Sequence, residues 1–255
     1  MTFFRITIAY DGTDFNGWQR QPDGTSIQAL LEDALAELDG RPVSVTGAGR
    51  TDAGVHALAQ VAAFSIERTI APDALVRAVN VRLPESVRVL EATPADAAFH
   101  PRFDARSKSY RYRIWNGAVL SPFERRYAWH IVDSLDVASM NAAAQLLVGT
   151  HDFAGFQGTG SDTATTTRTI VSSSLRIADC GVRIRSPQSA ILVYDVVGDG
   201  FLRYMVRNIV GSLVEIGRGR FPPTWLGEVL ASRDRTQAGR TAPAAGLFLV
   251  GVQYE

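Results

Sequence analysis

A glycine-rich segment between two expected strands carries an arginine and an aspartate. Residues Gly47–His56 read Gly-Ala-Gly-Arg-Thr-Asp-Ala-Gly-Val-His, which places Arg50 two residues before Asp52. Glycines permit positive φ angles and close backbone approach, and polar side chains on such a loop are typical of a binding or catalytic site. A solvated arginine beside an Asx turn explains the spacing equally well. The pattern fits neither a phosphate-binding P-loop nor the dinucleotide-binding G-x-G-x-x-G motif.

A second pair of charged residues, Arg203 and Arg207, is expected one turn apart on a long helix over residues 201–216. Apolar residues cover more than half of the circumference of this helix, so Arg207 falls at the margin of the buried stripe. A partly buried guanidinium needs an acid, because breaking a buried ion pair costs about 3–5 kcal/mol. Asp52 is a candidate partner. The alternative is an arginine whose stem lies along the helix flank and whose charge remains in water.

A basic segment runs from Arg102 to Arg126, with seven cations and two acids in a chain of zero formal net charge. Within it, an expected strand over residues 109–115 places Tyr110 and Tyr112 on one face. Aromatic side chains beside cations can stack on unpaired bases, and a local positive cluster can bind a polyanion. Strand tyrosines are equally typical of a hydrophobic core.

The remaining residue types exclude several other chemistries. One cysteine, Cys180, excludes an intramolecular disulfide and a multi-cysteine zinc site. The histidines have no metal-ligand spacing such as H-x-x-x-H: His56, His100, His130 and His151. No Ser-His-Asp or Cys-His grouping is identifiable. We therefore expect no metal site and no cofactor.

Hydrophobic periodicity predicts the elements that must position these residues. In the first half, strands are expected near residues 4–8, 43–45, 60–66 and 87–91, and helices near 27–38 and 72–81. Thr25 and Gln28 match a capping box before the first helix, and Gly40 ends it. In the second half, strands are expected near 109–115, 127–132, 169–177, 190–197 and 247–254, helices near 136–148, 201–216 and 223–231, and a loop at 155–167.

The order strand-helix-strand-strand-helix-strand is typical of the ferredoxin-like arrangement. We expect residues 1–101 to form an N-terminal ferredoxin-like domain that carries the Gly49–Val55 catalytic loop. Residues 102–255 are expected to form a C-terminal α+β domain. The predicted fold class is α+β, with two ferredoxin-like or RRM-like domains whose largely antiparallel sheets are flanked by helices.

Length and composition place the chain among globular proteins. It has 255 residues, of which 46% are hydrophobic and 20% are charged. These values exclude a disordered, collagen-like or coiled-coil chain. No apolar run approaches the ~20 residues that a membrane span needs, and the N-terminus has no signal-peptide core. We expect a cytoplasmic protein without a membrane segment.

Six motifs resemble, in the same order, those of the TruA family of tRNA pseudouridine synthases. Their most specific stretch is Gly49-Arg50-Thr51-Asp52-Ala53-Gly54-Val55-His56-Ala57. The others are Tyr10–Gln19, Phe99–Tyr112, Gly149–Phe153, Phe201–Arg207 and Ala242–Leu247. The resemblance extends over almost the whole chain.

This resemblance implies isomerisation of uridine to pseudouridine at positions 38, 39 and 40 of the tRNA anticodon stem-loop, by a homodimer without a cofactor. It implies that Asp52 is the catalytic carboxylate and that Arg207 keeps it ionised. Arg50 is implied to hold the RNA with the target base flipped out. Tyr110 is implied to stack on the uracil, and Leu247 to pack against its other side.

Three other functions are compatible with parts of the pattern. An RNA or nucleoside N-glycosidase usually needs two carboxylates, and Asp11 or Asp14 could be the second. A non-catalytic RNA-binding protein or RNA-folding chaperone would use the basic segment alone. A purely structural α/β protein would leave the Arg50–Asp52 loop and the Tyr110 strand without a role.

Overall fold

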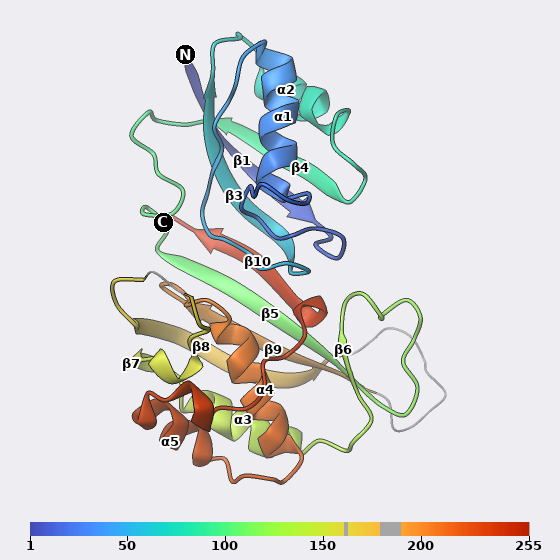
Figure 1. Ribbon diagram of the computed structural model, residues 1–255, viewed down its shortest axis with the longest axis vertical. Helices are drawn as coiled ribbons and strands as arrows, with labels where there is room; N and C mark the ends of the chain where they lie inside the picture. Colours follow the sequence, from blue (N-terminus) through green and yellow to red (C-terminus); the bar gives the residue numbers. More distant parts are fainter. Residues whose placement is uncertain (161–162, 179–189, 255) are drawn as a thin grey trace. The chain divides into compact units, whose positions relative to one another are not determined.

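The computed structural model describes residues 1–160, 163–178 and 190–254 (Figure 1). Cys180 lies outside the described residues. The chain divides into two compact units, Met1–Lys108 with Phe248–Glu255 and Ser109–Leu247. The sequence predicts a boundary after residue 101 and places the last strand in the second domain. In the structure, that strand joins the first unit because Phe248 and Leu249 pair with β3.

The first unit contains a sheet in the order β4-β1-β3, with β2 paired to β3. Its strands are β1 (Thr2–Tyr10), β2 (Thr46–Gly47), β3 (His56–Ile66), β4 (Val87–Pro94) and β10 (Leu247–Gln253). The pairs β1–β4, β1–β3 and β2–β3 are antiparallel, whereas β10 runs parallel to β3. The alternation in β1 buries Phe4, Ile6, Ile8 and Tyr10. The predicted order of elements is confirmed.

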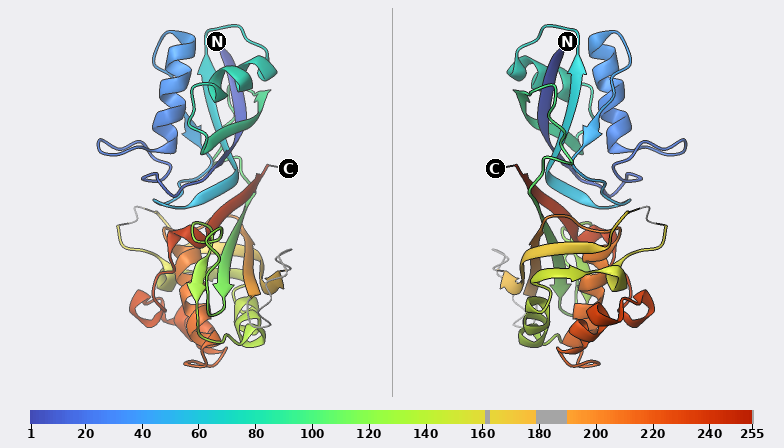
Figure 2. Two further views of the ribbon diagram at one scale, coloured as in Figure 1. Left: turned by 90° about the vertical axis from the view of Figure 1, so that its right-hand side faces the viewer. Right: turned by 90° about the vertical axis from the view of Figure 1, so that its left-hand side faces the viewer.

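Two helices, α1 (Ile27–Asp39) and α2 (Pro72–Asn80), pack against each other in this unit. Figure 2 shows α1 along one face of the sheet. The predicted capping box is wrong, because Ser26 and not Thr25 is the N-cap, and its hydroxyl accepts the Ala29 N–H at 3.3 Å. The Gln28 side chain instead donates to the Val45 carbonyl at 2.9 Å. Gly40 ends α1 with φ of 77°, as predicted.

The second unit contains a sheet in the order β5-β9-β8-β7, with β6 parallel to β5. Its strands are β5 (Ser107–Asn116), β6 (Trp129–Ile131), β7 (Gly149–Asp152), β8 (Thr167–Ala178) and β9 (Ala190–Gly198). The β7–β8 and β8–β9 pairs are antiparallel.

Two short strands differ from the prediction. Strand β7 of the second unit was not predicted, and the strand predicted at 43–45 in the first unit is displaced to β2. Both strands are too short for an alternating pattern to be recognised.

Three helices accompany this sheet: α3 (Val137–Gln145), α4 (Met205–Gly217) and α5 (Trp225–Ser232). Helix α3 packs on β8, α4 and α5. Within α4 every residue except Arg207 is buried. The helix begins at Met205, not at residue 201, because Tyr204 has a left-handed backbone with φ of 59°. The prediction that Arg203 lies on this helix is therefore wrong.

Short 3₁₀ helices complete the second unit: η1 (Ala154–Phe156), η2 (Arg235–Gln237) and η3 (Ala244–Gly246). Each unit combines a mainly antiparallel sheet with helices, which confirms the predicted α+β class. No helix in the described part of the chain is both long and apolar enough to cross a membrane.

Candidate active site

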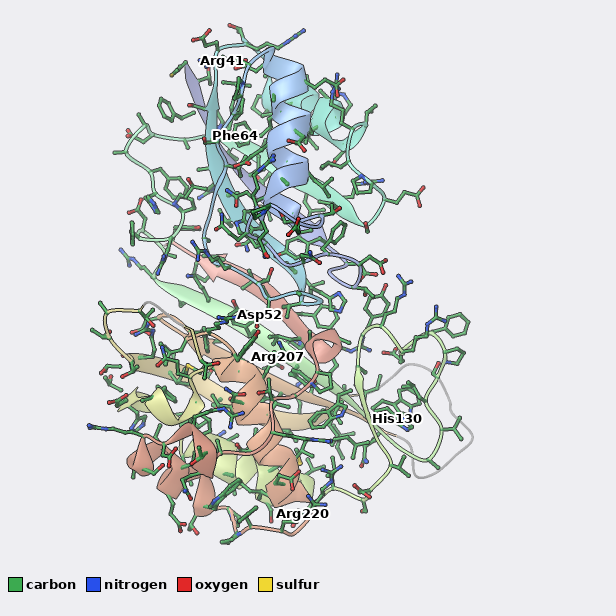
Figure 3. All side chains as sticks on the ribbon, viewed as in Figure 1. Arg41, Asp52, Phe64, His130, Arg207 and Arg220 are labelled. Atoms are coloured by element: carbon green, nitrogen blue, oxygen red, sulfur yellow. The ribbon has the colours of Figure 1, made fainter. Side chains whose placement is uncertain are left out.

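The glycine-rich segment Gly47–His56, called here the Asp52 loop, connects β2 to β3. Asp52 is half-buried in it and Arg50 is exposed (Asp52 is labelled in Figure 3). The residues at positions 51 and 55 are buried. The loop therefore exposes its two charged side chains from a backbone that is packed on both sides of Asp52.

Several hydrogen bonds hold this loop in place. The Thr51 hydroxyl lies 2.8 Å from the buried Tyr10 hydroxyl, and the Thr51 carbonyl accepts the Trp18 N–H at 3.0 Å. The Gln60 amide donates to the Gly49 carbonyl at 2.9 Å from a fully buried side chain. The Val55 N–H donates to the carbonyl of Asp52 itself at 3.1 Å. The carbonyls of Gly49, Thr51 and Asp52 are thus all held by hydrogen bonds.

Glycines in the preceding motif allow the loop to pack this closely. A Cβ on Gly12 would overlap the Val55 carbonyl, and one on Gly17 would lie 2.6 Å from the Thr51 carbonyl oxygen. Gly17 also has φ of 90°, which L side chains rarely adopt. The motif around residues 10–19 is therefore the support on which the Asp52 loop rests.

His56 joins the end of the loop to this support. Its Nδ1 accepts the Gly12 N–H at 3.0 Å, and its ring stacks on Phe248 at 4.6 Å. The Asp11 carboxylate lies 3.1 Å from the same nitrogen. The Gly12 backbone and the Asp11 carboxylate thus both meet the same ring nitrogen of His56. Asp11 also accepts from the backbone and hydroxyl of Thr13 at 3.0 and 2.5 Å.

In the second unit, Arg207 is half-buried on the first turn of α4 (labelled in Figure 3). Its Nε–H donates to the Ala242 carbonyl at 2.7 Å, and the Ala242 N–H donates back to the Arg207 carbonyl at 3.1 Å. Its guanidinium carbon lies 5.0 Å from the centre of the Tyr204 ring. A backbone carbonyl and an aromatic face thus both restrict the position of this guanidinium.

The two strand tyrosines have different environments on the same face of β5. Tyr112 is fully buried, and its hydroxyl donates to the Pro243 carbonyl at 2.7 Å. Burial raises the pKa of Tyr112 far above its usual range. Tyr110 is 9% exposed and meets the edge of Phe201 at 5.0 Å. Tyr112 is therefore a core residue that supports the segment before Leu247, which is itself buried.

The basic segment divides into paired and exposed cations. Arg111 forms an ion pair with Asp195 at 2.7 Å, and Arg113 with Glu124 at 2.8 Å. Arg102, Arg106 and Arg125 are exposed. The positive charge of the segment is thus partly balanced, by Glu124 within the segment and by Asp195 on β9.

The five predicted site residues are divided between the units. Arg50 and Asp52 lie in the first, whereas Tyr110, Arg207 and Leu247 lie in the second. Sequence reasoning missed two residues of this neighbourhood, Tyr10, whose hydroxyl contacts Thr51, and Tyr204, whose ring faces Arg207. Tyr10 has the same alternating pattern as any core residue of β1. The positive φ of Tyr204 has no signal in a sequence of this composition.

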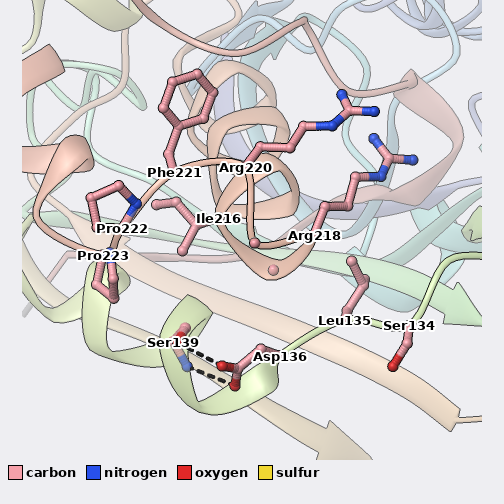
Figure 4. Close-up of a pocket in the computed structure, with 12 residues that line it drawn as sticks. Ser134, Leu135, Asp136, Ser139, Ile216, Arg218, Arg220, Phe221, Pro222 and Pro223 are labelled. Carbon is pink, nitrogen blue, oxygen red and sulfur yellow. Dashed lines mark hydrogen bonds between the residues drawn. The ribbon is translucent and has the colours of Figure 1, made fainter.

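A cavity of about 610 Å³ opens in the second unit between the start of α3 and the chain that follows α4 (Figure 4). Asp136, the N-cap of α3, and Arg218, Arg220 and Phe221 are among its lining residues. None of the five predicted site residues lines it. In the ranges that the structure describes, no group of three or more His, Cys, Asp or Glu could hold a metal ion.

Fold and local geometry define an α+β protein with a rigidly supported carboxylate in one unit and a positioned arginine near buried aromatics in the other. The chain belongs to the tRNA pseudouridine synthase family, whose model matches residues 6–104 and 143–255. This finding confirms the family that the motifs predict.

Relatives of similar length carry names that agree with this family. Proteins named tRNA pseudouridine synthase A from Pelobacter propionicus and Solibacter usitatus are 44% and 48% identical, each over the whole of both chains. One of the same name from Myxococcus xanthus is 42% identical over 100% of this chain and 92% of its own. These alignments include the stretch around Tyr110 that the family model leaves out.

Proposed function

We propose that this protein converts uridine to pseudouridine in tRNA, with Asp52 as the catalytic carboxylate. The family match carries the reaction type. The observation that supports Asp52 is its half-buried position on a loop held by Tyr10, Trp18 and Gln60. Catalytic groups need such preorganisation, because misplacement by about 1 Å can cost a hundredfold in rate.

The reaction breaks the N1–C1′ glycosidic bond, turns the base over and joins C5 to C1′. No atom is gained or lost, so neither a redox nor a group-transfer cofactor is required. One ionised carboxylate near the sugar is sufficient as nucleophile or base. Water must be kept away, since the detached base would otherwise be lost by hydrolysis.

The other four residues are proposed to act around Asp52. The Arg207 guanidinium would favour the ionised form of Asp52, as a nearby cation does for any carboxylate. Arg50 is exposed and two residues away, so it can enter the space that a flipped base leaves, which offsets part of the few kcal/mol of unstacking. Tyr110 and Leu247 would hold the uracil between them.

The proposed substrate is the anticodon stem-loop, at uridines 38, 39 and 40. A single pocket that serves adjacent positions must recognise RNA shape and backbone more than base identity. We further propose a cytoplasmic homodimer. Sedimentation equilibrium should give twice the chain mass of 27.7 kDa, and a monomer at micromolar concentration would contradict that part of the proposal.

Tritium release from tRNA labelled at uridine C5 tests the reaction and the carboxylate together. The wild type should release tritium without free uracil, and Asp52→Asn should lose at least about a thousandfold in rate, because a transition-state interaction is removed. Asp73→Asn is the matched control, an exposed aspartate on α2 of the same unit, and should retain wild-type activity.

The rival functions give different results in this assay. Free uracil would indicate an N-glycosidase, although Asp11, one candidate for its second carboxylate, is engaged with Thr13 and His56. Equal tRNA binding by wild type and Asp52→Asn, with no release by either, would indicate a binding protein. Unchanged turnover in Asp52→Asn would overturn the catalytic assignment.

A further inference from the structure

Tyr204 has an unusual backbone immediately before α4. Its φ and ψ are 59° and 1°, and in the described ranges only Arg233 among other non-glycine residues has a positive φ. The left-handed region is sterically unfavourable for a residue with a large side chain. Such a conformation persists only where surrounding contacts hold it, and it is concentrated at functional sites.

Helix capping does not explain the conformation. The Tyr204 side chain makes no capping hydrogen bond with the first turn of α4. Asn, Asp, Ser or Gly would serve better at such a position. The reason for an aromatic residue here must therefore be found in what its ring contacts.

The ring contacts two guanidinium groups. The Arg207 carbon Cζ lies 5.0 Å from the ring centre and that of Arg203 lies 4.9 Å from it. Both distances are within the range of cation–π attraction. Since Arg203 precedes the helix and Arg207 is in its first turn, the left-handed residue between them directs the ring to a place that both side chains can reach.

Residues 158–160 pack against the Tyr204 ring and bind Arg203. A Cβ on Gly158 would overlap the ring, and the Gly158 N–H donates to the Arg203 carbonyl at 2.8 Å. Arg203 Nη1 donates to the carbonyls of Thr159 and Gly160 at 3.1 and 3.0 Å. Arg203 is thus anchored on residues 158–160 and, with them, restricts the positions available to Tyr204.

We propose that Tyr204 is a positioning residue for the reaction, acting through Arg207. Its ring and the Ala242 carbonyl both contact the Arg207 guanidinium and so restrict its orientation. Arg203 and residues 158–160 keep the ring in place. The inference rests on the proposed function, in which Arg207 acts on Asp52.

Two variants distinguish the role of the Tyr204 ring from that of its left-handed backbone. Tyr204→Phe keeps the aromatic face, whereas Tyr204→Asn keeps a residue that tolerates a left-handed backbone and removes the face. Under single-turnover conditions, Tyr204→Phe should stay within about twofold of wild type in rate at saturating tRNA. Tyr204→Asn should fall by about tenfold or more with the Kd for tRNA nearly unchanged, because positioning acts in the transition state.

The matched control is Arg233→Asn, which makes the same kind of change at the other left-handed position and should leave the rate unchanged. Melting temperatures show whether each variant folds. If Tyr204→Asn does not fold, Tyr204→Gly, which adopts a positive φ without steric cost, replaces it.

Arg207→Gln separates failure of this inference from failure of the proposed function. If Arg207→Gln turns over like the wild type, the role proposed for Arg207 is wrong. If Arg207→Gln is inactive while a folded Tyr204→Asn matches the wild type, or if Tyr204→Phe is as impaired as Tyr204→Asn, the positioning role of the ring is overturned. A reduced rate in Tyr204→Asn together with a near wild-type rate in Tyr204→Phe supports the positioning role of the ring.

Discussion

At the scale of single residues, Asp52 is accessible to a substrate although its neighbour is held in the core. Asp52 is half-buried, whereas Thr51 beside it is buried and contacts the hydroxyl of Tyr10. A buried hydroxyl that loses its partner costs about 1–3 kcal/mol, so this contact stabilises the loop as well as orienting it. Tyr10 is therefore the residue through which stability and the candidate site are most directly linked.

The titration of Tyr10 gives a prediction in alkali. Burial raises the pKa of Tyr10 from 10.0 to about 12. Because the folded pKa lies above the unfolded one, the stabilising contribution is complete below pH 10 and is lost as the pH rises from 10 to about 12. When Tyr10 has titrated completely, the free energy of unfolding has fallen by about 3 kcal/mol.

Urea unfolding at pH 9 and pH 11.5 measures most of this loss. Tyr10→Phe should be less stable than the wild type at pH 9 and should lose less stability on going to pH 11.5. Part of the decrease should remain in the variant, because burial also raises the pKa of Tyr112 and Tyr194. Equal decreases in the two proteins would show that Tyr10 does not titrate in this range.

At the scale of elements, the Asp52 loop depends on a segment far from it in sequence. Residues 11–19 follow β1, and Gly12 and Gly17 among them let the backbone of the loop approach to contact distance. The loop and this segment thus form one packed structure rather than two independent turns. A side chain introduced at the contact must separate them.

Gly12→Ala tests this dependence. The new Cβ would overlap the Val55 carbonyl, so we expect a loss of about 1–3 kcal/mol in unfolding free energy, as for other overpacked sites. Turnover should fall more than tRNA affinity, since the loop that carries Asp52 is displaced.

Gly251→Ala on β10 is the control, because nothing lies within 4 Å of the position that its Cβ would occupy. It should change stability by less than about 0.5 kcal/mol, as surface substitutions do. A Gly12→Ala protein with wild-type stability and turnover would show that the loop tolerates separation from its support.

At the scale of the whole molecule, the formal net charge of zero conceals an uneven distribution. Several arginines are neutralised by acids within their own unit, including Arg111 by Asp195 and Arg113 by Glu124. Others in the basic segment are exposed, such as Arg102 and Arg106. A polyanion should therefore be bound by a subset of the arginines, not by the overall charge.

The salt dependence of tRNA binding distinguishes the exposed arginines from those in ion pairs. Arg102→Gln combined with Arg106→Gln should weaken binding and reduce the slope of log K against log salt by about 1–2, because each phosphate contact contributes ~0.7–0.9. Arg111→Gln removes the same kind of charge from an ion pair and should leave the slope unchanged while lowering the melting temperature. An equal change of slope in all these variants would argue for a diffuse field instead.

Much of the fold follows from local pattern. Helices α1 and α2 and strand β1 lie where periodicity predicts them, because each has one buried face and the repeat of that face is visible in the sequence. The start of α4 was missed for a physical reason. Residues 201–204 continue the apolar pattern of the helix, but the left-handed backbone of Tyr204 interrupts it.

The sequence alone determined the family, the α+β class and the loop that carries Arg50 and Asp52, because motifs and periodicity are properties of neighbouring residues. Only the tertiary structure distinguished Tyr112, a core residue, from Tyr110, and revealed the contacts of Tyr10 with Thr51 and of Tyr204 with Arg207. These roles depend on contacts between segments separated by tens of residues. Such contacts are decided by how side chains fill space after the chain has folded, which no local spacing encodes.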